Sequence, residues 1–361
     1  QHNVNVDLQG DNMNTALITA VNNYNLEIVK LLLQSNANVD LQNSQGNSAL
    51  MLAAEYGSME IVKLLLQKGA DLNSRDEFGN STLIAALADN HFEIIKILIE
   101  AGTDINLQCN DGTTLLMQAC KYKEKYSIQI VELLIQKNVN LNLQNNFGQT
   151  ALMHVFDHFN DISDISVDEQ ERMAIILAKK LIHAGADIEL TQRKGHNVLS
   201  LVIGRCFSNE IVKILIEKSN DLNKIYLNHE SLLIIATKGN NSKIVEALLE
   251  HDINLDIQNR SNHLTALMIA AENENLVIVQ MLLQKGANAN LQNSQGNTML
   301  HIAAQKGKDR IVSYIIDNNE VDINLLNNNG NTALMLAAEN ENLEIVQMLR
   351  TKLNARETRI S

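Results

Sequence analysis

Apolar and polar positions repeat along this chain with a period close to 33 residues, the spacing from Gly46 to Gly79. Each period holds two short apolar runs separated by a polar turn. In the clearest period the two runs form stripes at helical spacing, made of Leu50, Ala53 and Ala54 and of Val62, Leu65 and Leu66. The pattern predicts two amphipathic helices in every period, with alanines that let a neighbouring helix approach closely.

Capping and turn residues bound these predicted helices. The hydroxyl of Ser48 is placed to accept a backbone N–H in the first helical turn. Gly57 and Gly69 follow the two helices, where a left-handed residue ends a helix readily. Helices of about eight to ten residues are too short to be stable alone. Each period must therefore bury its apolar faces against its neighbours, which predicts a stack of repeats and favours a binding role.

Three nine-residue segments have nearly the same sequence: residues 46–54, 296–304 and 330–338. Each is followed by a second apolar run, such as residues 61–66, and in the first case then by Gly69-Ala70-Asp71-Leu72-Asn73. This order resembles the ankyrin repeat family, whose motif runs Gly-x-Thr-Pro-Leu-His-x-Ala-Ala, then Val-x-x-Leu-Leu and Gly-Ala-x-x-Asn. The resemblance implies an all-α solenoid of helix-turn-helix units with connecting β-hairpin-like loops.

The repeat pattern predicts a single ankyrin-repeat domain over residues 1–361. We expect about ten repeats, headed near residues 13, 46, 79, 112, 148, 195, 228, 263, 296 and 330. Residues 1–12 match the tail of a truncated upstream repeat, and the chain lacks an initiator methionine, so we expect a fragment. An insertion over residues 157–172 falls within the fifth repeat. It either lengthens the turn between the two helices or extends the second one, and it serves either as a tolerated loop or as an acidic contact finger.

The chain departs from the family motif at two positions that matter for stability. The family proline is replaced in every repeat, for example by Ala49, Thr82 and Thr114. The family histidine survives only as His301. We therefore expect the threonine–histidine hydrogen bonding between repeats to be mostly lost, with apolar packing in its place.

Charge and cysteine content narrow the class of partner. The formal net charge of −13 disfavours nucleic acid, which needs a basic face. No apolar stretch approaches the roughly 20 residues that span a bilayer, so we expect no membrane insertion. The three cysteines, Cys109, Cys120 and Cys206, are too widely spaced for a disulfide framework. This favours a reducing compartment and predicts a cytoplasmic location, or a host cytosol if the protein is a secreted effector.

Candidate chemistry is sparse. His154 and His158 have metal-ligand spacing near Asp157 and Asp161, but no third soft ligand accompanies them. His183 and Cys206 could pair as base and nucleophile, yet nothing around them matches a catalytic motif. The glycines recur singly, so no phosphate-binding loop is present. We predict no catalytic residue, cofactor or metal.

Partner-binding residues are predicted from the resemblance, which implies docking on loop tips and on the exposed face of each first helix. At those positions we expect four aromatic anchors: Tyr56, Phe78, Tyr122 and Phe147. Further candidates are Arg193, Lys194, Arg205, Tyr226 and Lys238. The basic ones among them favour a partner with an acidic segment. The alternatives are that each ring packs on a neighbouring tip and that the basic residues form an ordinary solvated surface.

These observations predict a monomeric, non-catalytic scaffold that binds a protein partner on its concave groove. The alternative is a recognition fragment of a larger protein, such as an enzyme, a channel or a bacterial or protist effector, whose active domain lies outside this chain. An enzyme within these residues is disfavoured, because no set of polar side chains from several repeats converges in the pattern.

Overall fold

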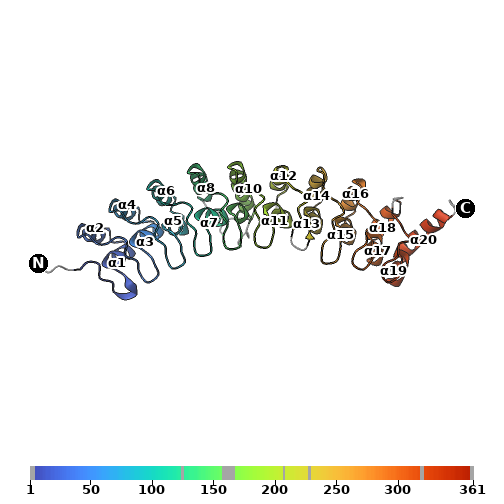
Figure 1. The fold of residues 1–361 in the computed structure, drawn as a ribbon, viewed down its shortest axis with the longest axis horizontal. Helices are drawn as coiled ribbons and strands as arrows, with labels where there is room; N and C mark the ends of the chain where they lie inside the picture. Colours follow the sequence, from blue (N-terminus) through green and yellow to red (C-terminus); the bar gives the residue numbers. More distant parts are fainter. Residues whose placement is uncertain are drawn as a thin grey trace. The chain divides into compact units, whose positions relative to one another are not determined.

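The computed structural model describes residues 5–122, 126–156, 167–205, 208–226, 229–317 and 321–357, without the side chains of residues 122, 167, 168, 356 and 357. The chain forms two compact units, Gln1–Arg193 and Lys194–Ser361. In the described residues of both units the regular structure consists of helices, which confirms the predicted all-α class. Figure 1 labels these helices along the chain.

In the first unit, helices alternate between two rows (Figure 1). The first helices of successive repeats are α1 (Ala16–Asn22), α3 (Ala49–Glu55), α5 (Thr82–Ala88), α7 (Leu115–Tyr122) and α9 (Ala151–His154). The second helices are α2 (Leu26–Gln34), α4 (Met59–Gln67), α6 (Phe92–Glu100), α8 (Ser127–Gln136) and α10 (Val167–His183). A short 3-10 helix, Asp11–Met13, precedes them.

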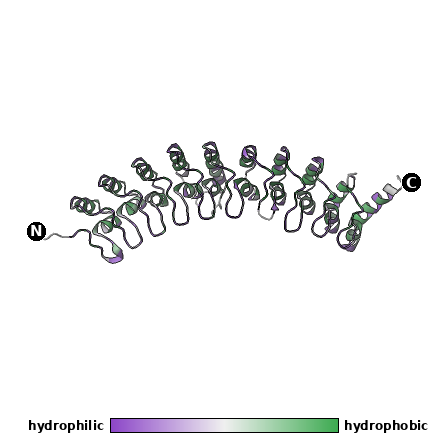
Figure 2. Cartoon of the chain, viewed as in Figure 1, coloured by the Kyte–Doolittle hydropathy of each residue, from purple (hydrophilic) through white to green (hydrophobic). Residues whose placement is uncertain are grey.

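The second unit repeats this arrangement. Its first helices are α11 (Val198–Gly204), α13 (Leu232–Lys238), α15 (Ala266–Glu272), α17 (Met299–Gln305) and α19 (Ala333–Glu339). Its second helices are α12 (Asn209–Lys218), α14 (Ser242–Leu249), α16 (Leu276–Gln284), α18 (Asp309–Ile316) and α20 (Leu343–Glu357). Within each unit the apolar residues gather in the helices, and the connecting loops are polar (Figure 2).

The helix boundaries follow from the capping chemistry read in the sequence. Ser48 Oγ accepts a hydrogen bond from Met51 N at 3.3 Å, so the predicted cap of α3 is confirmed. Gly57 and Gly69, after α3 and α4, have φ values of 71° and 78°, as predicted for left-handed helix ends. In the connecting loops, isolated antiparallel bridges join Gln42 to Ser48, Arg75 to Ser81 and Gln108 to Thr114.

In two repeats the structure assigns the motif positions to residues one place further along the chain than the sequence suggested. Thr114 Oγ1 accepts from Met117 N at 3.2 Å, so Thr114 is the cap of α7 and Leu115 takes the place of the family proline. In the repeat headed near 228, the left-handed residue is His229, with φ 62°. Its N–H bonds to the Tyr226 carbonyl at 3.1 Å, as Gly46 N does to Asn43. The head is therefore His229, in a repeat that lacks the glycine found at most other heads.

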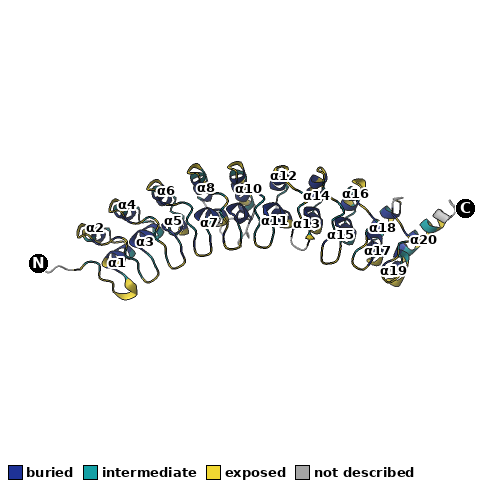
Figure 3. Cartoon of the chain, viewed as in Figure 1, coloured by how far each residue is buried: buried dark blue, intermediate teal, exposed yellow. Residues whose placement is uncertain are grey.

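The core of each unit lies where the two rows of helices face each other. Leu50, Val62 and Leu65 are fully buried there, as their helical spacing predicted. The buried residues of Figure 3 concentrate in the first helices and on the inner face of the second helices, whereas exposed residues follow the loops. Each repeat thus supplies apolar faces that only its neighbours cover.

Polar ladders also join successive repeats, so the expectation that apolar packing alone replaces the threonine–histidine bonds is wrong. Gln108 Nε2 donates to Gly112 O at 2.7 Å and to Gln144 O in the next repeat at 3.0 Å. The same pair of hydrogen bonds, one within the repeat and one to the next, is donated by Gln42, Gln144, Gln258 and Gln292. A second ladder runs through Asx side chains. For example, Asp40 Oδ1 accepts from Asp71 N at 2.8 Å.

The predicted insertion of residues 157–172 lies partly outside the described residues, which resume at 167. From there the chain is already helical, and α10 spans 17 residues, against 9 in α4. Meanwhile α9 is only 4 residues long and ends at His154. The fifth repeat therefore pairs a short first helix with a long second helix.

Candidate protein-binding surface

The loop tip that carries Phe78 is built by an Asx turn. The carboxylate oxygen Oδ1 of Asp76 accepts from Phe78 N at 2.9 Å and from Asn80 N at 2.7 Å. The other oxygen accepts from Asn80 Nδ2 at 2.8 Å. In addition, Phe78 O accepts from Asn110 N in the next tip at 3.0 Å. A backbone fixed at both ends presents a ring that is 65% exposed.

Phe147 is presented in the same way two repeats further on. Asn145 Oδ1 accepts from Phe147 N at 3.0 Å and from Gln149 N at 2.9 Å. The Phe147 carbonyl accepts from Arg193 N, at 2.8 Å. The ring is 60% exposed. Neither phenylalanine is packed into the stack, which places both at positions where a partner can reach them.

Tyr56 lies at the C-terminal end of α3 and is half-buried. Its ring packs against that of Tyr24 in the preceding repeat, with centroids 5.3 Å apart and planes tilted by 45°. Burial, and then the nearby Glu55 and Tyr24, raise the pKa of the Tyr56 hydroxyl. The phenol therefore stays neutral at physiological pH and acts as an apolar ring with a hydrogen-bonding tip.

Tyr56 and Phe78 line the same hollow, which has a volume of about 760 Å³. Its floor comes from residues of α3 and α5 such as Leu52 and Ile84, and Gln118 of α7 also lines it. Asp76 of the Phe78 tip also lines it. Phe147 is not among the lining residues, so the structure brings together two of the predicted aromatic anchors and leaves this one apart.

The hollow is acidic, which the sequence analysis did not predict. Burial, and then the charges of Asp89 and Asp76, raise the pKa of the Glu55 carboxyl. Among the described residues, no lysine or arginine lines this hollow. Glu55 was overlooked although it precedes Tyr56 and follows the alanine pair, the position that marked the exposed face of each first helix.

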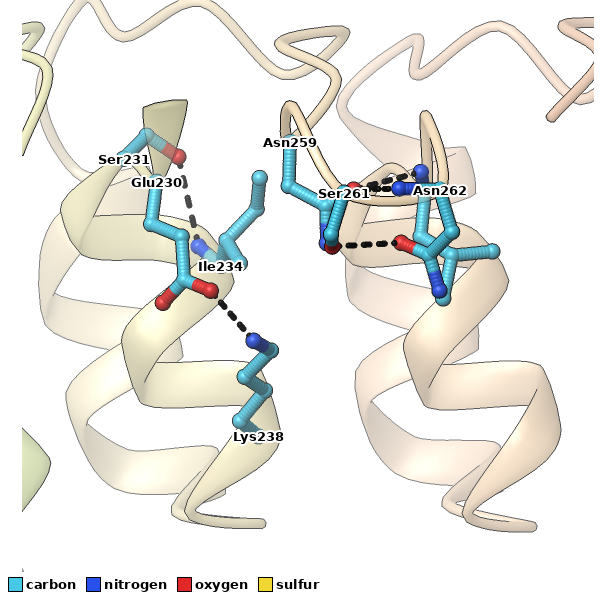
Figure 4. A network of polar contacts seen from close by, with 8 residues as sticks. Glu230, Ser231, Ile234, Lys238, Asn259, Ser261 and Asn262 are labelled. Atoms are coloured by element: carbon cyan, nitrogen blue, oxygen red, sulfur yellow. Dashed lines mark hydrogen bonds and ion pairs between the residues drawn. The ribbon is translucent and has the colours of Figure 1, made fainter. Parts of the chain in front are cut away.

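The remaining predicted contacts are spread over both units. Arg193 is exposed at the end of the first unit, while Lys194 and Arg205 are exposed in the second. Lys238 forms an ion pair with the Glu230 carboxylate, which Figure 4 shows beside the Ser231 cap of α13. Its charge is thus offset within the protein. The side chain of Tyr122 lies outside the described residues.

The expectation that Tyr226 is presented to a partner is wrong. Its side chain is only 5% exposed, and its ring stacks on that of His196 with centroids 5.9 Å apart. The cause is the register correction given above. With the head at His229, Tyr226 occupies the first position of the turn, whose equivalents Cys109 and Asn145 are also buried.

Two chemically reactive side chains, Cys109 and His154, are buried in the first unit. Burial, and then the carboxylates of Asp111 and Asp76, raise the pKa of the Cys109 thiol to about 11, which disfavours the nucleophilic thiolate. Nε2 of the buried His154 lies 3.2 Å from Nδ2 of Asn145. The other residues of the disfavoured metal set, Asp157, His158 and Asp161, lie outside the described residues. So does Cys206, which the sequence disfavoured as a partner of the exposed His183.

Stacked helix pairs joined by tight polar turns define a helical repeat protein. The family model described as ankyrin repeats (3 copies) matches residues 1–76, 78–163, 173–259, 205–293 and 267–359. The chain therefore belongs to the ankyrin repeat family, as the sequence motif predicted. Members of this family are generally protein–protein interaction modules.

Solved structures agree with this assignment. The chain is similar to the crystal structure of the ankyrin repeat domain of Bcl-3, described as a unique member of the IkappaB protein family. The TM-score is 0.54 and the identity 25%, over 67% of this chain and 100% of that chain. Among curated proteins, no sequence matches significantly. Within the described residues, no helix combines the length and apolar character needed to cross a membrane.

Proposed function

We propose that this chain is a non-catalytic scaffold that binds a protein partner across its loop tips and first helices, with Tyr56, Phe78 and Phe147 as anchors. The observation that carries the proposal is the presentation of Phe78. The backbone N–H and carbonyl of Phe78 are both hydrogen-bonded, and the loop tip holds the ring in solvent beside a hollow of about 760 Å³. Exposing a large ring costs free energy in water that partner binding recovers.

An acidic partner segment remains a proposal for the second unit. Lys194 is exposed there and suits such a segment, whereas Lys238 forms an ion pair with Glu230. The positive surface is therefore smaller than the sequence suggested. The same binding role would serve a larger protein, such as an enzyme, channel or effector with its active domain elsewhere, and a cytoplasmic setting and monomeric state complete the proposal.

The test compares three proteins in pull-downs from cell lysate, with captured partners identified by mass spectrometry and then purified for direct titration. They are the native chain, a variant with Tyr56→Ala, Phe78→Ala and Phe147→Ala, and a control with Ile28→Ala and Leu31→Ala. The control removes exposed apolar side chains from α2, in the row of second helices.

A partner that binds the native chain and the control but not the aromatic variant supports the proposal. Helical content and melting temperature must match among the three proteins, so that loss of binding is not loss of fold. Equal binding to all three places the interface elsewhere, and the 157–172 insertion is then the next segment to delete.

A further inference from the structure

The hollow of the first unit combines an apolar floor, aromatic edges and negative charge in one place. Its floor includes Leu52, Ile84 and Leu87, which are buried beneath it. Tyr56 and Phe78 stand at its edges. This combination discriminates between partners more sharply than an apolar surface alone, because an incoming charge must match the charges already present.

Three carboxylates set the charge of this hollow. Glu55 and Asp76 line it, and Asp89 lies at the end of α5, between the lining residues Ala88 and Asn90. Asp76 is hydrogen-bonded within its own turn, which neutralises none of its charge. For Glu55 the structure describes no ion pair, and both other carboxylates act on it to raise its pKa. A cation placed here relieves repulsion that the free protein retains.

The basic residue in the loop of Asp76 does not supply that cation. Arg75, in the loop before Asp76, directs Nη1 to the Gln108 carbonyl at 2.8 Å and so forms part of the polar ladder. It is not among the lining residues of the hollow.

We propose that the hollow between α3, α5 and the Phe78 tip receives a lysine or arginine side chain from an extended segment of a protein partner. The inference rests on the proposed function and names the chemistry of what binds there. The cationic head lies by the carboxylates of Glu55 and Asp89, and the rings of Tyr56 and Phe78 flank the aliphatic stem. Both contacts are favourable, since long basic side chains bury their stems on apolar surface and their charge interacts with aromatic faces.

Charge complementarity selects this occupant over the others. An acidic segment is repelled by the carboxylates, and a nucleic acid is repelled for the same reason. A second copy of this chain is disfavoured by its own formal net charge of −13. A neutral apolar segment fills the floor but leaves the three carboxylates unmatched.

The experiment selects peptides from a random library displayed on phage against the immobilised full chain. Enriched sequences are then made as fluorescent peptides and titrated by polarisation. Each is measured against the native chain and against Glu55→Gln with Asp89→Asn, which changes charge but hardly changes shape. The control is Glu60→Gln with Glu100→Gln, which removes two exposed charges from α4 and α6 outside the hollow. A fourth protein carries Tyr56→Ala and Phe78→Ala.

We expect enriched peptides to share a lysine or arginine. The Glu55 and Asp89 variant should bind them with an affinity about ten-fold lower, or lower still, at low salt, and this loss of affinity should shrink as salt rises. The Glu60 and Glu100 control should change affinity much less. Replacing the shared basic residue by glutamine in the peptide should abolish the difference between native and variant.

The outcomes separate this inference from the proposed function. Peptides that need Tyr56 and Phe78 but tolerate loss of the two carboxylates overturn the cation site and leave the binding surface standing. Peptides that tolerate both changes overturn both. Enriched sequences without a basic residue also overturn the cation site.

Discussion

His301 Nε2 donates a hydrogen bond to the carbonyl oxygen of Asn331 at 3.1 Å, and this bond joins two successive repeats of the second unit. Because Nε2 carries the proton, Nδ1 is the acceptor for the Thr298 hydroxyl at 2.8 Å and for the Thr298 backbone N–H at 3.3 Å. The two contacts that Nδ1 accepts require the neutral ring, whereas Nε2 can donate to Asn331 in either protonation state. The single histidine that the family motif retains here therefore combines a helix cap with a link between repeats.

This arrangement predicts that the protein loses stability in mild acid. Burial lowers the pKa of His301 from its ordinary 6.5, so the unfolded chain takes up the proton first as pH falls. The contribution of His301 is complete above that value and declines as pH falls through it towards the lower pKa of the folded protein. His301→Met places at this position the residue that other repeats have, as in Met51 and Met335.

The measurement is the melting temperature of both proteins at about pH 7.5 and about pH 5.5. The melting temperature of the native protein should fall further between the two pH values than that of His301→Met, because only the native protein has this ring to keep unprotonated. Carboxylates affect both proteins alike and cancel in the comparison. Equal falls would show that the His301 network does not oppose protonation.

The glutamine ladder predicts an unusually large effect for a polar loop residue. Gln108→Ala removes two hydrogen bonds, one of them to the next repeat. At roughly 0.5–1.5 kcal/mol for each bond, the free energy of unfolding should fall by about 1–3 kcal/mol. The matched control is Gln45→Ala, an exposed tip glutamine with no described side-chain hydrogen bond, which should change stability by less than about 0.5 kcal/mol. Urea titration of both variants distinguishes a ladder from a solvated surface.

The sequence predicted the helix pairs, their caps and their terminal glycines because these depend on residues a few positions apart. It did not predict the ladders, since the carbonyl that Gln108 reaches lies 36 residues away at Gln144. A signal was nevertheless present, because glutamine recurs at the same place in several repeats, as in Gln42 and Gln292.

The candidate site was predicted less completely than the fold. Phe78 and Phe147 could be placed on tips because each directly precedes a head glycine. Tyr226 was placed wrongly, because its repeat has no such glycine and the register slipped by one residue. Part of the acidity of the hollow comes from Glu55 at the end of α3 and Asp89 directly after α5, and the packing of α3 beside α5 brings these two together.

Two threonines at the starts of neighbouring first helices should respond oppositely to the same substitution. Thr82 is fully buried, and its hydroxyl has no hydrogen-bond partner among the described residues. Thr82→Val keeps the shape and removes this unpaired group, so it should raise the free energy of unfolding by about 1 kcal/mol. The hydroxyl of Thr114 caps α7 instead, so Thr114→Val should lower it by about 1 kcal/mol. If thermal unfolding shows that the melting temperatures of both variants shift in the same direction, the assignment of Thr114 as a cap and of the Thr82 hydroxyl as unpaired is contradicted.

Two glycines with nearly the same backbone conformation should differ in what they tolerate. Gly46 and Gly69 have φ values of 79° and 78°, so alanine meets similar backbone strain at each, about 1–2 kcal/mol. A Cβ at Gly69 has no atom within 4 Å, whereas at Gly46 it lies 2.8 Å from the backbone of Asp76 and Glu77. Overpacking of this kind typically costs about 1–3 kcal/mol more, so Gly46→Ala should be the less stable variant in urea titration.

The difference should extend to binding, because the turn that Gly46→Ala displaces also holds Phe78. The affinity for a partner or peptide that requires Phe78 should fall in Gly46→Ala and stay near the native value in Gly69→Ala. Titration at a temperature where both variants remain folded separates this effect from global unfolding. If Gly46→Ala binds as the native chain does, the tip adjusts freely, and the rigid presentation of Phe78 is not what the partner uses.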